Sequence, residues 1–341
     1  MTRGSTDESS SGSGELPPVS SPVFVALADG GWTATSCDGG QTWVQQALSD
    51  KMGDHTPWTA FGGLAFGNDA FVAGLGWGAP GYLLYSSDGI SWEPLPAERF
   101  MADGQVVGYD SYTAAVAFDG REFVAFSSLA WRSSTGTHWE QVDLQLPPGA
   151  DQLRQLRGFD DGVLVAAVES QSGQGHPVGN FVVVTQDGGD SWTEGTGYDG
   201  ACSGAIQHWG DIERADGVLL VGTRDVCRSL DLGQSWDVLV DPLGEDIQDL
   251  FADAQGFGAV AGSRVFHSDD GLSWTQVADV GSPLAKAAHG RDAWAAVGAT
   301  GSEFFWSDDG LRWQPGTLQT PPGPDVYVRD MVVGYPSRGC P

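Results

Sequence analysis

The heptapeptide Ser268-Asp269-Asp270-Gly271-Leu272-Ser273-Trp274 is one of seven related segments that recur along the chain. The other copies are SCDGGQTW at 36–43, SSDGISW at 86–92, SSTGTHW at 133–139, TQDGGDSW at 185–192, SLDLGQSW at 229–236 and SDDGLRW at 307–313. They share the frame Ser/Thr-x-Asp-(x)-Gly-x-Ser/Thr-Trp, although Thr135 replaces one aspartate, and His138 and Arg312 each precede a tryptophan. Successive tryptophans are 49, 47, 53, 44, 38 and 39 residues apart. Self-similarity at this period predicts a radial or stacked repeat fold.

A turn and two short apolar runs precede most copies of this repeated motif. One example is GGLAF at 62–66, which is followed by GNDAFVAGL at 67–75. Apolar runs of this length, separated by Gly-Asp turns, are typical of β-strands. Each repeat therefore predicts four strands: A before the turn, B after it, C leading into the motif, and D starting at the tryptophan. Four strands per repeat predict an all-β, seven-bladed β-propeller of four-stranded antiparallel blades.

The motif itself is predicted to be the hairpin between strands C and D. Its aspartate can accept backbone N–H groups of the turn, its glycine allows a positive φ, and its tryptophan can be buried between blades. We interpret these residues as structural rather than catalytic. They are Asp38, Trp43, Asp88, Trp92, Trp139, Asp187, Trp192, Asp231, Trp236, Asp270, Trp274, Asp309 and Trp313.

The motif resembles the Asp-box, also called the bacterial neuraminidase repeat. This box occurs in sialidases, some xyloglucanases, sortilin-type receptors and photosystem II assembly factors. The resemblance covers about residues 22–340 and implies a propeller of the sialidase-like kind. It does not select an activity, because the same box occurs in hydrolases and in binding proteins.

The two ends of the chain predict how the ring closes. Residues 1–20 are rich in serine, glycine and acidic residues, so we predict a disordered linker there and a propeller over residues 21–341. The first repeat begins with strand B and lacks its own strand A. A spare strand at 326–335 follows the last motif, and we predict that it becomes strand A of blade 1. Such closure removes the free edges of the sheet ring.

Four cysteines allow three pairings. The lower face of the propeller is defined here as the face with the A–B turns and the motif turns. Cys37 and Cys340 are expected at this lower face, and Cys202 and Cys227 near the opposite, upper face. Only the pairs Cys37–Cys340 and Cys202–Cys227 then avoid crossing the disc. The alternative is four free buried thiols.

Composition restricts the partners and the compartment. The chain carries 45 acidic and 16 basic residues, for a formal net charge of −29. Such a surface repels phosphate backbones, so we expect no nucleic-acid partner. Disulfide-compatible cysteines favour an extracellular or periplasmic location. No stretch is long enough to span a membrane. The N-terminal segment resembles the spacer behind the lipid-bearing cysteine of bacterial lipoproteins, so we expect an export leader, and possible lipid anchoring, ahead of residue 1.

The predicted binding site lies at the upper mouth of the central channel. The long connections 49–57, 95–111, 169–180, 195–206 and 314–325 are expected on the upper face, where they would carry binding residues on a rigid scaffold. No catalytic motif and no metal-ligand spacing is present, and a calcium ion would have no supporting loop motif. The ligand-binding candidates combine aromatic, charged and histidine side chains: Trp58, Tyr112, Arg154, His208, Asp211, Asp249, Lys286, Arg329 and Asp330.

Two functions compete for this site. The first is a monomeric, exported, non-catalytic propeller that binds a glycan or an envelope protein at one asymmetric site. The second is a glycoside hydrolase of the Asp-box type, for which Asp211, Asp249 and Asp330 would supply the carboxyl groups. A typical sialidase is disfavoured, because those enzymes have six blades and an arginine ahead of the first box, where only Arg3 stands here. We favour the binding protein.

Overall fold

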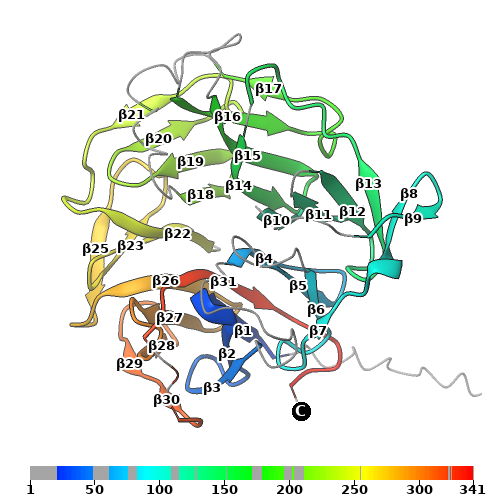
Figure 1. Cartoon of the computed structure of the whole chain (residues 1–341). Coiled ribbons are helices and arrows are strands. Elements are labelled where there is room, and N and C mark those ends of the chain that lie inside the picture. Colours follow the sequence, from blue (N-terminus) through cyan, green and yellow to red (C-terminus); the bar gives the residue numbers. More distant parts are fainter. Residues whose placement is uncertain are drawn as a thin grey trace, which may run out of the picture.

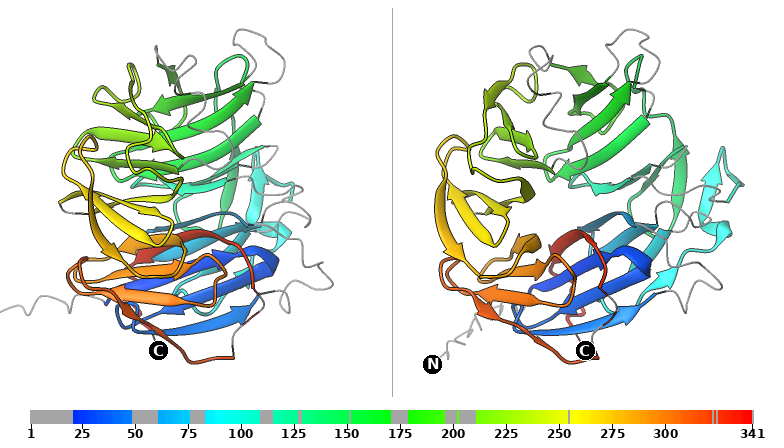
Figure 2. Two further views of the ribbon diagram at one scale, coloured as in Figure 1. Left: turned by 90° about the vertical axis from the view of Figure 1, so that its left-hand side faces the viewer. Right: turned by 60° about the vertical axis from the view of Figure 1, so that its left-hand side comes forward.

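The structure is a computed structural model that describes residues 21–48, 61–75, 83–108, 115–126, 129–150, 152–170, 179–195, 202, 211–253, 255–321, 323 and 325–340. Within these ranges the chain forms seven sheets arranged around a central axis, which is the predicted seven-bladed propeller (Figure 1 and Figure 2). The predicted linker 1–20 lies outside the described residues.

Each blade has strands A to D from the axis outward. Blade 1 consists of β31 (Val328–Gly334), β1 (Val23–Ala28), β2 (Trp32–Ser36) and β3 (Thr42–Ala47), and blade 2 of β4 (Phe61–Gly67), β5 (Ala70–Leu75), β6 (Leu83–Ser86) and β7 (Glu93–Pro94). Blade 3 consists of β10 (Ala115–Phe118), β11 (Phe123–Phe126), β12 (Ala130–Ser133) and β13 (Trp139–Val142), and blade 4 of β14 (Gln152–Phe159), β15 (Val163–Ser170), β16 (Gly179–Thr185) and β17 (Thr193–Glu194). Blade 5 consists of β18 (Asp211–Ala215), β19 (Val218–Gly222), β20 (Val226–Ser229) and β21 (Asp237–Leu239). Blade 6 consists of β22 (Ile247–Asp253), β23 (Gly256–Ala261), β24 (Arg264–Ser268) and β25 (Thr275–Asp279), and blade 7 of β26 (Leu284–His289), β27 (Trp294–Gly298), β28 (Phe304–Ser307) and β29 (Gln314–Pro315).

The hydrophobic core is divided into clusters that lie between neighbouring blades. One cluster joins blade 1 to blade 7 through Phe24, Trp43, Val297 and Phe304, and the rings of Trp43 and Phe304 stack with their centroids 4.5 Å apart. The middle strands are buried on both faces and are therefore almost wholly apolar, as in Val163–Ser170. Each blade is stabilised mainly by burial against its two neighbours.

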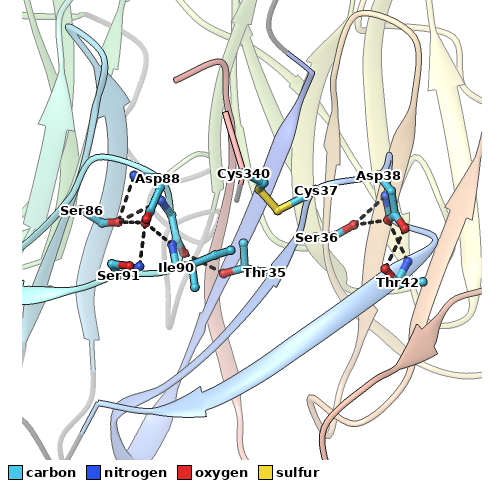
Figure 3. The surroundings of a disulfide bond; sticks show 12 residues. Thr35, Ser36, Cys37, Asp38, Thr42, Ser86, Asp88, Ile90, Ser91 and Cys340 are labelled. Atoms are coloured by element: carbon cyan, nitrogen blue, oxygen red, sulfur yellow. Dashed lines mark hydrogen bonds between the residues drawn. A yellow bond between two sulfur atoms is a disulfide. The ribbon is translucent and has the colours of Figure 1, made fainter. Parts of the chain in front are cut away.

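The ring closes through the C-terminal strand, as predicted. β31 pairs with β1 in antiparallel register, with Val332 opposite Val25 and Val333 opposite Phe24. The structure contains both predicted disulfides, Cys37–Cys340 and Cys202–Cys227. Figure 3 shows that Cys37–Cys340 lies between the motif turns of blades 1 and 2. The chain end beyond β31 is thereby joined to the hairpin of the blade that it completes.

The motif turns come in two lengths with two hydrogen-bond patterns. In the eight-residue copies, the aspartate binds the residue four positions later, as when Asp38 accepts the Thr42 N–H at 2.8 Å and the Thr42 hydroxyl at 2.7 Å (Figure 3). In the seven-residue copies, it accepts two successive N–H groups, as Asp88 does from Ile90 at 2.8 Å and Ser91 at 2.6 Å. The same two patterns recur at Asp187, Asp231, Asp270 and Asp309. Either pattern satisfies the N–H of the residue before the tryptophan.

The motif tryptophans are held by the turn that precedes them. The indole Nε1 of Trp43 donates to the Gly40 carbonyl at 2.7 Å, and Trp139 donates to Gly136 at 3.1 Å. Corresponding bonds form at Trp92 and Trp313. Trp192, Trp236 and Trp274 stand at the same position in blades 4, 5 and 6. In blade 3, which lacks the aspartate, the Thr135 hydroxyl accepts the Thr137 N–H at 3.3 Å.

Two long connections differ from the sequence expectation. Residues 95–111 and 314–325 were predicted to lie on the upper face, but parts of both run along the outer edge of the next blade. β8 (Phe100–Ala102) pairs in parallel with β13 and continues into β9 (Gln105–Val106), while β30 (Thr317–Leu318) pairs in parallel with β3 (Figure 1). Both pairings are made at the level of the motif tryptophan, which stands just above the lower face. Apolar burial explains the route of the first, because Phe100 is buried against Trp131 at this edge.

Two short 3-10 helices occur within the described ranges, η1 (Asp29–Gly31) and η3 (Ala97–Arg99). No helix in this part of the chain is long and apolar enough to cross a membrane.

Candidate functional site

A recurring β-bulge shapes the inner strands that surround the channel. In β4, β14, β22, β26 and β31 the pairing with strand B skips one residue, at Gly62, Arg154, Gln248, Ala285 and Arg329 respectively. A bulge bends its strand and re-aims the side chain that follows. The residues that follow the five bulges are Gly63, Gln155, Asp249, Lys286 and Asp330, and we call their level the channel layer. Asp211 in blade 5 and Ala115 in blade 3 belong to this layer by position.

Two cations and three carboxylates form one network in the channel layer. Lys286 Nζ lies 3.1 Å from Asp211 Oδ2 and 2.7 Å from Asp249 Oδ1. Arg157 extends from blade 4 to both sides, with Nη2 3.3 Å from Asp211 Oδ1 and Nη1 3.5 Å from Asp330 Oδ1. Four predicted candidates, Asp211, Asp249, Lys286 and Asp330, are therefore brought together. The side chains of Asp211 and Asp249 are each only 3% exposed.

Each of the three aspartates of this network also forms a hydrogen bond from its own blade to the next blade in the ring. Asp211 Oδ2 accepts the Leu250 N–H at 3.1 Å, which joins blade 5 to blade 6. Asp249 Oδ2 accepts the Ala287 N–H at 2.7 Å, which joins blade 6 to blade 7. Asp330 Oδ2 accepts the Leu64 N–H at 2.9 Å, which joins blade 1 to blade 2. Their carboxyl groups thus satisfy buried backbone donors on neighbouring inner strands.

Glycine occupies the same layer in blade 2 because the next strand approaches too closely for a side chain. Gly63 has φ +140°, and a Cβ atom there would lie 2.9 Å from the backbone nitrogen of Val116 in β10. The layer is therefore charged in one sector and nearly free of side chains in another, where Gly63 and Ala115 stand.

Burial and neighbouring charges separate the pKa values of the two aspartates that share Lys286. For Asp211, burial alone would raise the pKa, but Lys286 and Arg157 outweigh it and hold the pKa well below its ordinary value. For Asp249, burial is the larger effect, and with the adjacent Asp211 charge it raises the pKa well above the ordinary value despite Lys286. Burial opposes the charge of Lys286 too, but both carboxylates raise its pKa, so it remains an ammonium at neutral pH.

Sequence reasoning missed Arg157 and Glu213. Arg157 follows the layer residue Gln155 by two positions, and Glu213 follows Asp211 by two. Because side chains two residues apart in a strand point to the same face, this spacing is the signal that could have identified them. The Glu213 carboxyl accepts the Arg214 N–H at 2.8 Å. Burial raises the pKa of Glu213 to about 7, although the Arg157 guanidinium opposes the shift.

Replacing Glu213 with glutamine should stabilise the protein above neutral pH. Because the folded-state pKa of about 7 exceeds the ordinary 4.5, the native state binds this proton more tightly, and the associated stability is lost as pH rises through 7. We expect Glu213→Gln to raise the free energy of unfolding by about 2 kcal/mol at pH 8 and to change it little at pH 4.5. Urea unfolding at both pH values measures this, with exposed Glu140→Gln as control. Equal effects at the two pH values would contradict the assignment.

The two arginine candidates are bulge residues paired within their own blades. Arg154 binds Glu169 of β15 through Nε at 2.6 Å and through Nη2. Arg329 forms a two-pronged ion pair with Asp29, with Nε–Oδ1 2.7 Å and Nη2–Oδ2 2.6 Å. Trp58, Tyr112 and His208 lie outside the described residues.

Two of the cavities in the described part of the chain lie toward the lower face. One of about 160 Å³ occupies the lower channel, where its walls are apolar residues of blades 1 to 4 with Arg157 beside them. The other, of about 410 Å³, lies between the A–B turns of blades 4 and 5, where Arg214 binds both Asp161 oxygens at 2.7 Å. No group of three histidine, cysteine or acidic side chains within the described ranges is placed to hold a metal ion.

No protein-family model and no curated protein sequence matches the chain. Among solved structures, YCF48 bound to D1 peptide is similar, with a TM-score of 0.52 and 15% identity over 85% of this chain and 87% of that chain. A catalytically inactive variant of virginiamycin B lyase from Staphylococcus aureus with quinupristin has a TM-score of 0.52 and 9% identity, covering 76% of this chain and 85% of that one. A streptogramin B lyase gives a TM-score of 0.52 at 10% identity over 76% and 83%. These likenesses show a β-propeller fold, which serves both a peptide-bound protein and lyases.

Proposed function

We propose that this chain is a non-catalytic binding propeller of the Asp-box type, exported to an oxidising compartment, with one asymmetric site at the upper mouth of its channel. The observation that carries the proposal is the commitment of the channel carboxylates. A glycoside hydrolase needs two carboxyl groups that reach the glycosidic bond. Asp211, Asp249 and Asp330 instead accept N–H groups of the next blade and pair with Lys286 or Arg157.

The unequal channel layer supports a single site. Seven equivalent sites would require similar side chains in each blade. The layer instead runs from glycine in blade 2 through glutamine in blade 4 to lysine in blade 7. Such asymmetry suits one partner that is held on the axis in one orientation.

The proposed location and partner follow from more general features. Two disulfides favour an extracellular or periplasmic compartment, and lipid anchoring is part of the proposal. The net charge of −29 disfavours anionic partners. The likeness to a peptide-bound propeller makes an envelope protein the first partner class to test and a glycan the second.

Parallel peptide and glycan arrays with the oxidised protein test the proposal. A saturable hit that is recovered intact after prolonged incubation supports a binding protein. Release of reducing sugar from a glycan hit would instead establish the hydrolase alternative. Trp58→Ala and His208→Ala should weaken binding if the upper mouth is the site, whereas Asp216→Ala, in a lower-face turn, should leave it unchanged. The reverse pattern would place the site at the lower face.

A further inference from the structure

Among the described residues, blades 1 and 3 carry an extra strand on their outer edge, and blade 1 shows how it is held. The Thr317 N–H donates to the Gln41 carbonyl and the Gln319 N–H donates to the Trp43 carbonyl, both at 2.8 Å. In return, the Gln45 N–H donates to the Thr320 hydroxyl at 2.9 Å. The added segment therefore bonds to three backbone groups of blade 1. Two are carbonyls, that of the motif tryptophan Trp43 and that of Gln41 two residues before it. The third is the N–H of Gln45, two residues after the tryptophan.

The position two residues after the motif tryptophan distinguishes the blades. It is glutamine in blades 1 and 3, Gln45 and Gln141, and these are the blades in which the described residues form an added strand. In blade 1 the Gln45 amide also holds the segment, because its Oε1 accepts the Gly323 N–H at 2.9 Å, while its Nε2 donates to the Gly301 carbonyl of blade 7 at 2.5 Å. Blades 2 and 7 have Pro94 and Pro315 there, and proline offers no N–H to an added strand.

Blade 6 is the third blade with glutamine at this position, Gln276, but its outer edge is uncovered by any residue that the structure describes. β25 is the outermost strand of its sheet. Gln276 lies opposite Phe266 in β24 as Gln45 lies opposite Ala34 in β2, so its N–H corresponds to the outward donor of blade 1. The carbonyls of Leu272 and Trp274 correspond to those of Gln41 and Trp43. The bulge in β25 falls at Val277, just beyond this stretch.

The side chains around this edge leave apolar surface for an added segment to cover. Trp274 is only partly buried, and Leu272 beside it is 44% exposed. An extended segment that covered Trp274 would remove this surface from water.

The charge of the outer edge of blade 6 indicates which charged side chains an added segment would carry. Asp269 at its lower end has a side chain that is 89% exposed, and Asp279 is exposed at its upper end. Asp279 accepts hydrogen bonds from the Ser263 hydroxyl at 2.8 Å and the Gly281 N–H at 3.0 Å, and Arg264 lies opposite it in β24. Asp269 contacts only a histidine among the described residues, with its Oδ1 2.9 Å from His267 Nε2. A segment with lysine or arginine at both ends would complement these carboxylates.

We propose that the outer edge of blade 6 is a docking site for an extended basic segment of a partner protein, which adds in parallel to β25 as β30 adds to β3. Backbone hydrogen bonds to Leu272, Trp274 and Gln276 would hold the segment, and the exposed carboxylates would select its charge. This inference is independent of the channel site, because the edge lies on the outside of the ring (Figure 1).

Gln276→Pro is the variant that tests the edge. It removes the outward N–H, and the blades tolerate proline there, as Pro94 and Pro315 demonstrate. A random heptapeptide library displayed on phage is selected on the oxidised protein and counter-selected on Gln276→Pro. We expect enrichment of peptides with lysine or arginine at both ends. Fluorescence anisotropy should show that Gln276→Pro weakens their binding at least about tenfold. Glu194→Pro, the matched change in blade 4, should not weaken it.

Three outcomes would overturn the proposal. The first is that no peptide is enriched over the Gln276→Pro counter-selection. The second is that enriched peptides bind wild type and Gln276→Pro equally. The third is a concentration-dependent dimer in sedimentation velocity that Gln276→Pro abolishes, since the edge would then belong to a second copy of the chain. A peptide whose binding is lost in Trp58→Ala but kept in Gln276→Pro would be a case of the second outcome, with the peptide bound at the channel site.

Discussion

Removing the disulfide between Cys37 and Cys340 is expected to lower the free energy of unfolding by about 4 to 5 kcal/mol. The bond joins residues that are 303 positions apart, so it closes a loop over nearly the whole chain and restricts the unfolded state strongly. The variant is Cys37→Ser/Cys340→Ser, which leaves no free thiol. Urea unfolding followed by tryptophan fluorescence, under oxidising conditions, measures the change.

The second disulfide supplies the matched control. Cys202–Cys227 closes a loop of 25 residues, for which the same argument gives about 3.5 kcal/mol. We therefore expect Cys202→Ser/Cys227→Ser to have the smaller effect. If the two double variants were equally destabilised, the ring would be held by strand pairing and not by the long covalent loop.

Local opening gives a further expectation for the same variant. Thr35 Oγ1 donates to the Gly89 carbonyl at 2.7 Å, so blades 1 and 2 are already joined beside the disulfide (Figure 3). Without the disulfide, β31 is held by its pairing with β1, by its packing against blades 2 and 7, and by the side-chain contacts of Arg329 and Asp330. Native-state hydrogen exchange should therefore accelerate in β31 more than in β15, which lies in the middle of blade 4.

The sequence predicted the ring because its signals are local and repeated. Seven copies of one hairpin motif determine the blade count, and a first repeat without strand A requires the spare strand predicted at 326–335, which the structure shows as β31. The two disulfides follow from which end of a strand each cysteine occupies. These conclusions need only strand order and direction.

The roles of the channel residues could not be predicted in the same way. A bulge of one residue turns Asp249 and Asp330 toward the next inner strand, and nothing in a short apolar strand pattern marks where a bulge falls. The strand additions at β8 and β30 join segments that are distant in sequence, so no local pattern shows them. The sequence shows whether glutamine or proline stands two residues after each motif tryptophan. That this residue bears on strand addition becomes clear only from the pairing in blade 1.

Replacing Lys286 with methionine is expected to lower the free energy of unfolding by about 3 kcal/mol at pH 7. Lys286 Nζ is the only cation within ion-pair distance of Asp249 among the described residues, and the Asp249 side chain is 3% exposed. Without the ammonium, Asp249 must stay protonated or be buried as an unpaired charge. The pKa of Asp249 is already raised by burial and by Asp211, and the loss of Lys286 would raise it further.

The pH dependence of this loss has a definite sign. In the variant both Asp211 and Asp249 would have folded-state pKa values above those of the wild type. A raised folded-state pKa gives stability that is present at low pH and is lost as pH rises through it. The deficit of Lys286→Met should therefore shrink as pH falls from 7 to 4, as measured by urea unfolding. A constant deficit would mean that lost packing, and not the unpaired carboxylate, causes the destabilisation.

A double variant separates the ion pair from the blade-to-blade hydrogen bond. Asp249→Asn keeps an oxygen that can accept the Ala287 N–H but carries no charge that requires Lys286. We expect Lys286→Met/Asp249→Asn to recover most of the stability that Lys286→Met loses, since replacing both partners of a buried pair costs less than removing one. Such recovery would mean that the Asp249 oxygen joins blade 6 to blade 7 through the Ala287 N–H, and that Lys286 serves to neutralise the Asp249 charge. If the double variant were as unstable as Lys286→Met alone, Lys286 would instead stabilise the ring mainly through Asp211.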